Sequence, residues 1–145
     1  MSFNFVSMKK RIFLVFCLFC LCLIPFASIQ GSIKFDDYFE DKTMRLDYFH
    51  SGNAKEEHFA VDRILSDGKW GGSKTILIDQ LNLGYYQFDV IDKESDILLY
   101  SRGFASIYGE WETTAEAKKQ WGTFHESIRF PWPKKNVKVV LKKKR

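Results

Sequence analysis

Apolar and polar residues alternate along several short stretches of the chain, and the clearest pair of stretches lies in its middle. Every second residue from Tyr86 to Val90 is apolar, with single polar residues between, which is the pattern of a strand with one buried face. The polar segment 92–95 has the length of a hairpin connection, and the more continuously apolar segment 96–101 follows it. We predict a β-hairpin here, with the second strand deeper in the sheet than the first.

Similar patterns predict further strands on both sides of this hairpin. The segment 35–41 is acidic and aromatic and is interpreted as a lead-in strand or a cap. Clear strand patterns recur at a spacing of roughly ten residues, separated by turn residues. They cover 43–49, 57–66, 75–79, 124–130 and 137–142.

Helical signals are confined to one short segment. Residues 113–121 combine alanines, a threonine N-cap and acidic residues before basic ones, which predicts a helix of one or two turns. The segment 104–111 is ambiguous, and Pro131-Trp132-Pro133 excludes a central strand and indicates a corner. The predicted fold class is all-β: an antiparallel β-sandwich, Ig-like or jelly-roll-like, with seven to eight strands and one short helix.

The first thirty residues differ in character from the rest. Lys9-Lys10-Arg11 precedes an apolar run from Ile12 to Phe26 and a small-residue exit, which is the organisation of a secretory signal peptide. We therefore predict a signal peptide over 1–30, cleaved between Ala27 and Gly31, and a single β-sandwich domain over 31–145. A retained anchor is the alternative, but the run is shorter than the ~20 residues needed to span a bilayer. Export to the periplasm, cell surface or exterior is expected, with no stable membrane span after cleavage.

Cysteine and charge distribution narrow the possible functions. All three cysteines lie in the apolar run, so residues 31–145 have neither disulfides nor thiol chemistry. Residues 1–30 hold three basic residues and no acidic one, leaving 19 basic and 18 acidic residues beyond them. Seven of those 19 fall within 134–145, so the rest of the domain is acidic. A basic end on an acidic body does not predict nucleic-acid binding, and it is interpreted as a solvated strand or a linker.

Neither metal nor catalytic residues emerge from the sequence. The histidines at 50, 58 and 125 share no short ligand spacing. His125-Glu126 begins like a zincin motif, but Arg129 stands where the second histidine ligand would be, and the flanking residues alternate as in a strand. We expect no cofactor, no metal and no catalytic residue in this chain.

Aromatic residues, 17% of the chain, remain as the candidate binding chemistry. Several lie next to glycine or proline breaks, where a ring can be displayed to a sugar or a peptide, although in a small sandwich most such rings serve core or corner packing. The candidates for ligand or domain contact are Trp70, Tyr108, Trp111 and Trp132.

Four segments together resemble a known family. They are 51–59 (SGNAKEEHF), 81–86 (LNLGYY), 101–111 (SRGFASIYGEW) and 124–133 (FHESIRFPWP). In order and spacing they are similar to the N-terminal domain of the bacterial IgA-type zinc metallopeptidases (peptidase family M, number sixty-four). The resemblance runs from about Phe35 to Lys144.

The resemblance implies a β-sandwich that precedes a separate zinc-dependent catalytic domain in an exported protein. The metal ligands and the catalytic glutamate of that family lie in the second domain, so none is carried over to a position here. The expected function is a non-catalytic, exported accessory domain that engages substrate or packs against a catalytic domain. The alternative is a free-standing module that binds carbohydrate or peptide. Expected partners are a metallopeptidase catalytic domain or an extracellular glycoprotein or glycan.

Overall fold

The computed structural model describes residues 33–144, which contain six strands and two short helices. In chain order the elements are α2 (Phe35–Tyr38), β1 (Phe39–Gly52), β2 (Glu57–Ser66), β3 (Tyr86–Asp92), β4 (Leu98–Phe104), α3 (Ile107–Trp111), β5 (Gly122–Pro133) and β6 (Val137–Lys143). The predicted signal peptide lies outside the described residues and stays a prediction.

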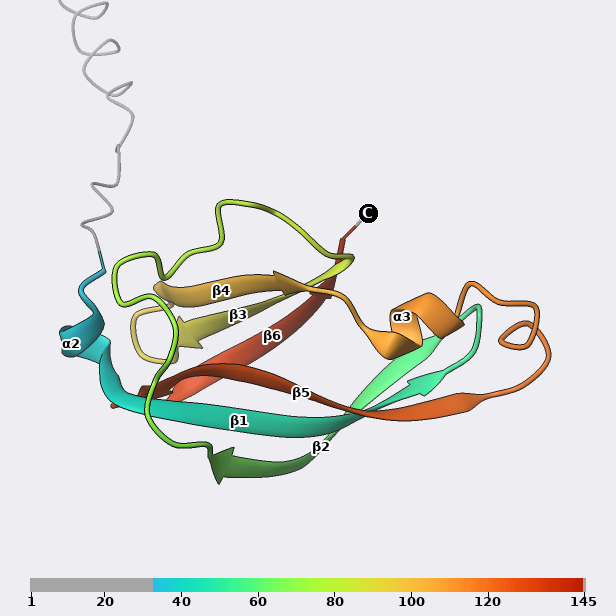
Figure 1. The fold of residues 1–145 in the computed structure, drawn as a ribbon, viewed down its shortest axis with the longest axis horizontal. Coiled ribbons are helices and arrows are strands. Elements are labelled where there is room, and N and C mark those ends of the chain that lie inside the picture. The colour runs from blue at the N-terminus through green and yellow to red at the C-terminus, as the bar shows by residue number, and fades with distance from the viewer. Residues whose placement is uncertain (1–32, 145) are drawn as a thin grey trace, which may run out of the picture. The chain divides into compact units, whose positions relative to one another are not determined.

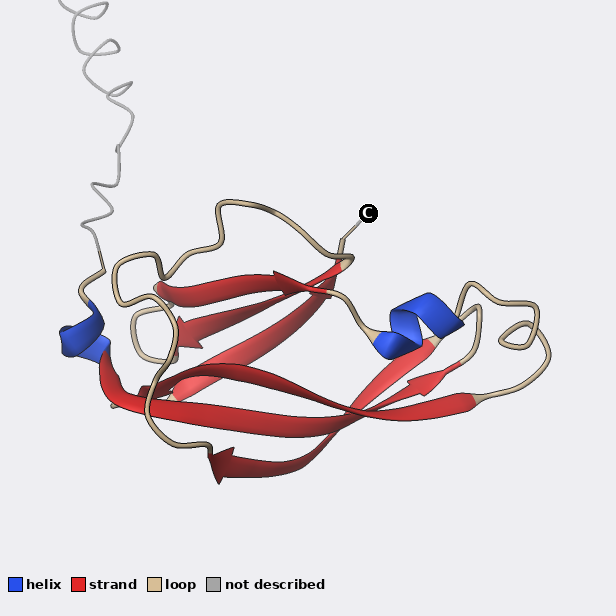
Figure 2. Cartoon of the chain, viewed as in Figure 1, coloured by secondary structure: helices blue, strands red, loops and turns tan. Residues whose placement is uncertain are grey.

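The strands form two three-stranded antiparallel sheets, ordered β2-β1-β5 and β4-β3-β6. Figure 1 shows the sheets as two layers, and Figure 2 shows that strands and loops make up nearly all of the domain. Phe88 of β3 and Phe130 of β5 meet between the layers, with ring centroids 6.0 Å apart. The all-β prediction is confirmed, but the described residues form six strands rather than seven or eight.

β1 is the centre of the first sheet. Its residue His50 lies opposite Phe59 on β2 and opposite Phe124 on β5. As the alternation predicts, Leu46 and Tyr48 are buried on the inner face. The register with β2 shifts between Asp47 and Tyr48, a β-bulge that changes the parity of the inward-facing residues along β2.

The central hairpin is confirmed as β3 and β4, but the relative depth of its strands was predicted wrongly. β3, not β4, is the central strand, and it buries Tyr86, Phe88 and Val90. β4 is an edge strand whose outer side is covered by the loop between β2 and β3. There the Ser101 amide donates to the Leu77 carbonyl at 3.0 Å, and Leu77 is buried. This cover explains why β4 is so continuously apolar although it lies at the edge.

The prediction of a strand over 75–79 is wrong, because this segment belongs to the loop that covers β4. Its Asp79 amide donates to the hydroxyl of Ser101 at 2.9 Å, and its carboxylate accepts from the Gly103 amide at 3.0 Å. These side-chain contacts replace the regular ladder that a strand would make.

The helix predicted over 113–121 is also wrong, since this segment is a series of turns. Ala117 is completely buried, and its carbonyl accepts from the Ala54 amide at 3.0 Å. A segment of about nine residues has little helical stability of its own, so this tertiary contact decides its conformation. The helix occurs earlier, as α3, where the Ser106 hydroxyl caps it by accepting from the Gly109 amide.

Both strands predicted for the last part of the domain are present, but the first of them, β5, ends later than predicted. β5 continues through Pro131 to Pro133 instead of turning a corner at these prolines, which is possible because it is an edge strand. β6 is confirmed. No helix in the described part of the chain is long and apolar enough to cross a bilayer.

Candidate functional site

The densest group of polar side chains is buried where α3 meets β1, β2 and β5. His50 of β1 is completely buried between two carboxylates: its Nδ1 lies 3.4 Å from Glu126 Oε2 and its Nε2 lies 3.2 Å from Glu57 Oε2. Glu126 comes from β5 and Glu57 from the start of β2. We call these residues, together with Ser106 and Tyr108, the His50 cluster.

Glu126 is the most heavily hydrogen-bonded member of the His50 cluster. It accepts from the Tyr48 hydroxyl at 2.8 Å, from the Ser106 hydroxyl at 2.8 Å and from the Tyr108 amide at 3.1 Å. Burial by itself raises the pKa of Glu126, but the hydrogen bonds from His50 and these donors outweigh burial and lower it to about 2. Glu126 is therefore a carboxylate at any pH near neutrality.

The two ring nitrogens of His50 have different partners. Nε2 faces the Glu57 carboxylate. Nδ1 faces Glu126 and the Ser106 hydroxyl, which is 3.2 Å away and donates its own proton to Glu126.

Aromatic rings enclose His50. Tyr108 stacks on one face of His50 at 3.9 Å between centroids, Phe59 lies over the ring at 4.1 Å, and Tyr86 approaches edge-on at 5.5 Å. Rings packed at these distances stabilise one another and exclude water from the imidazole.

Glu57 links the His50 cluster to the second sheet. It accepts from the Tyr86 hydroxyl of β3 at 2.8 Å and from the ammonium group of Lys143 of β6 at 3.3 Å. Lys143 also donates to Glu112 at 2.6 Å. Burial lowers the pKa of Lys143, but the two carboxylates outweigh this effect and raise it above its usual value. The cluster therefore connects both sheets.

A serine beside a histidine raises the question of nucleophilic catalysis. Ser106 Oγ lies within hydrogen-bonding distance of His50, but it donates to Glu126 and also accepts from the Gly109 amide. A nucleophile must pass its proton to a base, whereas Ser106 directs its proton to Glu126 and not to His50. Ser106 is also buried, so no substrate reaches it. The arrangement holds strands together and does not form a catalytic dyad.

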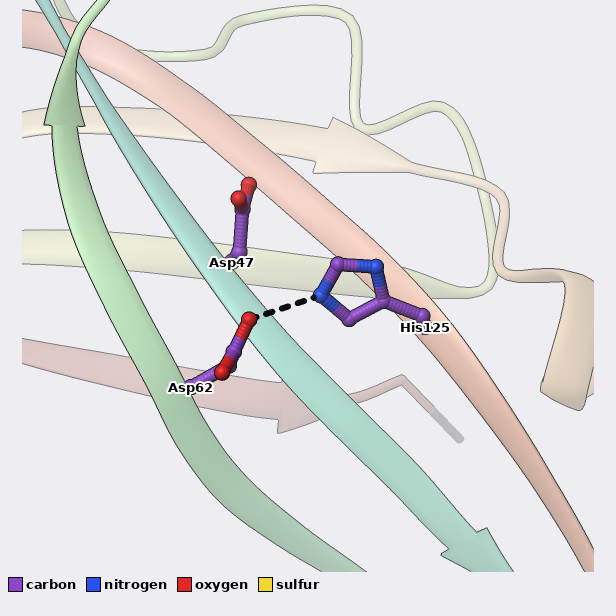
Figure 3. A group of neighbouring side chains, drawn as sticks. All are labelled: Asp47, Asp62 and His125. Carbon is purple, nitrogen blue, oxygen red and sulfur yellow. Dashed lines mark hydrogen bonds and ion pairs between the residues drawn. The ribbon is translucent and has the colours of Figure 1, made fainter.

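A second group, on the outer face of the first sheet, brings together Asp47, Asp62 and His125 (Figure 3). His125 Nε2 lies 3.1 Å from Asp62 Oδ2. Sequence spacing could not predict this group, because the three residues lie on three different strands. The two oxygens of Asp47 are already bound by Arg45 and Arg63, each at 3.0 Å. Two guanidinium ions beside a carboxylate repel a divalent cation, so these residues fit an ion-pair network better than a metal site.

Two of the four predicted contact residues lie together: Tyr108 belongs to the His50 cluster, and Trp111 packs against it. Tyr108 is completely buried, and its hydroxyl donates to the carbonyl oxygens of Asn53 and Glu56 at 2.9 and 3.0 Å. Trp111 packs on Tyr108 with ring centroids 5.9 Å apart. The ring of Tyr108 has no free face for a ligand in this conformation, whereas Trp111 is half-buried.

The other two predicted contact residues lie elsewhere and apart from each other. Trp70 packs edge-on against Tyr100 at 5.9 Å, beside the second sheet. Trp132, near the end of β5, carries the ammonium group of Lys42 over its ring at 3.9 Å. The four residues therefore do not form one platform, and their role in ligand or domain contact stays a prediction.

The residue that sequence reasoning missed is Trp121. It lies just before β5, its side chain is 54% exposed, and it stacks on His58 at 5.7 Å with an interplanar angle of 13°. It lines a pocket of about 190 Å³ between the β1–β2 turn and the segment 117–121. Gly122, which follows Trp121, indicates a break in the chain where a ring can be displayed. The helix predicted over 113–121 included Trp121, so the residue was not considered as a contact residue.

Comparison with protein families places the domain in a known family. The family described as Peptidase M64 N-terminus matches residues 34–145, which is more than half of the chain. The chain belongs to this family, and the predicted resemblance is confirmed. A comparison with curated proteins found no match.

Proposed function

We propose that this chain is a non-catalytic, exported accessory domain of a metallopeptidase, and that its role is to engage the substrate that a catalytic domain cleaves. The family match supports the peptidase context, because it is specific to the N-terminal part. The observation that carries the proposal is the fate of the polar groups: His50, Glu126 and Ser106 are buried and bonded to one another. These side chains stabilise the fold and are not accessible to a substrate. We therefore assign the binding role to the exposed surface of the domain.

A hydrolysis assay tests the first part of the proposal. The full chain, expressed with its own N-terminal segment and purified after processing, should not degrade casein with or without added zinc. Casein hydrolysis that persists after repeated purification and stops with a chelator would overturn the proposal.

Fractionation of the expressing cells tests export, since a processed chain should leave the cytoplasm, and retention there would contradict the localisation.

A second role, packing against a catalytic domain, is favoured by one observation. Leu83 and Tyr85 are largely exposed, and they lie beside the last described residue, where the Lys144 amide donates to the Tyr85 carbonyl at 2.8 Å. Any segment that follows therefore leaves the domain next to an apolar surface. The nucleotide sequence beyond the codon for Arg145 distinguishes both of these roles from that of a free-standing module that binds carbohydrate or peptide. A downstream frame that encodes His-Glu-x-x-His favours a peptidase context, whereas an intergenic stretch favours the free-standing binding module.

A further inference from the structure

The pocket beside Trp121 is formed by two segments that are far apart in sequence. One wall is the β1–β2 turn at Asn53–Lys55, and the other is the segment 117–121 that leads into β5. The pocket has a volume of about 190 Å³, enough for part of one ring-sized group. It lies on the end of the domain that carries α3 and the His50 cluster.

The walls of this pocket are held in place. The Ala54 amide donates to the Ala117 carbonyl at 3.0 Å, which ties the two walls together. Asn53 accepts from the Lys55 amide at 2.8 Å through its side-chain oxygen, and this fixes the turn. Beneath the turn, the buried Tyr108 hydroxyl donates to the Asn53 carbonyl. A pre-formed pocket loses little conformational entropy when it binds a ligand.

The chemistry of the lining is cationic and aromatic. Lys55, Lys118 and Lys119 line the pocket, and none of them forms an ion pair with a described carboxylate. The carboxylates next to these lining residues in the sequence have other partners. Glu56 faces His58 at 3.9 Å, and Glu116 accepts from Trp111 and Gln120. A positive pocket in an otherwise acidic body attracts an anion.

We propose that this pocket binds an acidic saccharide. The exposed indole of Trp121 offers a flat apolar surface for the face of a sugar ring. The ammonium groups of the three lysines complement a carboxylate on the sugar, and the amides of Asn53 and Gln120 suit its hydroxyl groups. A bare anion would use the lysines without the indole, whereas a neutral sugar would use the indole without the lysines. The inference rests on the proposed role in substrate engagement and supplies its ligand class.

Binding is tested on the full chain, purified in its processed form, by calorimetry and NMR. The probes are sialyllactose and a hyaluronan tetrasaccharide, with lactose as the neutral control, inorganic phosphate as the charge-only control and an oligoglutamate peptide as the acidic-peptide control. We expect an acidic saccharide to bind with a Kd of about 0.1–1 mM, as is usual for a small, partly open site, and lactose to bind at least ~10-fold more weakly. Trp121→Ala and Lys118→Glu should each weaken saccharide binding about 10-fold or more.

Matched variants control for general effects. Phe49→Ala removes another exposed aromatic ring, and Lys135→Glu reverses another surface lysine, so both should bind as the unchanged protein does. Circular dichroism verifies that each variant is folded. The proposal is overturned if neither acidic saccharide binds, if phosphate or oligoglutamate binds as tightly, or if Trp121→Ala has no effect. These outcomes leave the casein result untouched, so failure here is distinguishable from failure of the non-catalytic assignment.

Discussion

At the scale of single residues, Glu126 determines how the domain responds to acid. Its pKa of about 2 in the folded state, below the usual 4.5, means that unfolding takes up a proton at acidic pH. The stability that this carboxylate contributes is fully present above about pH 4.5 and is lost as the pH falls toward 2. We expect the free energy of unfolding to decline over this range more steeply in the unchanged protein than in Glu126→Gln.

The same substitution has a cost at neutral pH. Glu126→Gln replaces a carboxylate that accepts from the Tyr48 and Ser106 hydroxyls, and losing hydrogen bonds to a charged group typically costs about 1.5–3 kcal/mol. Glu94→Gln, at an exposed ion pair with Lys135, is the matched control and should cost under ~0.5 kcal/mol. Urea unfolding at several pH values measures both effects, and parallel pH profiles for the two variants would contradict the role given to Glu126.

Gly52 is required by close packing under the β1–β2 turn. A Cβ atom at this position would lie 2.5 Å from the Tyr108 hydroxyl and would collide with the Glu56 carbonyl. Gly52→Ala should therefore destabilise the domain by about 1–3 kcal/mol. Gly71→Ala, where a Cβ atom meets nothing within 4 Å, should change stability by less than ~0.5 kcal/mol or raise it slightly. Equal thermal midpoints for the two variants would argue against the packing at Gly52.

At the scale of elements, position in the sheet matters more than the direction of a side chain. Phe88 and Val61 both point toward the inner side of their sheets, but Phe88 is buried and Val61 is 67% exposed, because β2 is an edge strand. Phe88→Ala should cost about 3–5 kcal/mol, and Val61→Ala under ~0.5 kcal/mol. Chemical denaturation measures both, and a large loss with Val61→Ala would mean that β2 is covered in solution.

The end of β6 is better anchored than its composition predicts. The sequence pattern predicts a solvated strand or a linker over 134–145. In the structure Lys143 bridges Glu57 and Glu112, and the Lys144 amide donates to the Tyr85 carbonyl.

We therefore expect Lys143→Met to cost about 1 kcal/mol, while Lys138→Met, at an exposed pair, costs less. Because the pKa of Lys143 is raised on folding, its contribution is fully present below the usual 10.5 and is lost as the pH rises further. Thermal unfolding measured from neutral to strongly alkaline pH would show whether the difference between the Lys143→Met variant and the unchanged protein narrows as expected.

At the scale of the whole molecule, the two sheets should unfold together. They share one core, in which Phe88 and Phe130 meet, and Glu57 binds groups from both sheets. Tryptophan fluorescence and far-ultraviolet circular dichroism should give coincident urea transitions, and Phe130→Ala should shift both equally. Two separate transitions would show that the sheets are independent.

Local patterns were sufficient for much of the fold. Alternation predicted β1, β2, β3, β5 and β6, because side chains of a strand point to the same face at every second residue, although β2 at the edge is almost entirely exposed. Alternation failed at 75–79, where side chains of Asp79 and Ser101 replace the strand ladder. The helical signals failed at 113–121, where the Ala117 carbonyl is bonded to the β1–β2 turn. In both places a contact between distant segments overrides the local preference.

The sequence by itself determined the strand class, the hairpin and the family, because these depend on periodicity and on ordered motifs within short windows. Only the tertiary structure decided the sites. His50, Glu57, Ser106 and Glu126 meet through three strands and a helix cap, and no spacing along the chain encodes that meeting. The pocket beside Trp121 likewise exists only because the turn at Asn53–Lys55 folds against a segment more than sixty positions away. The residues within a short window determine the local backbone conformation. Burial and charge pairing instead depend on which distant segments pack together.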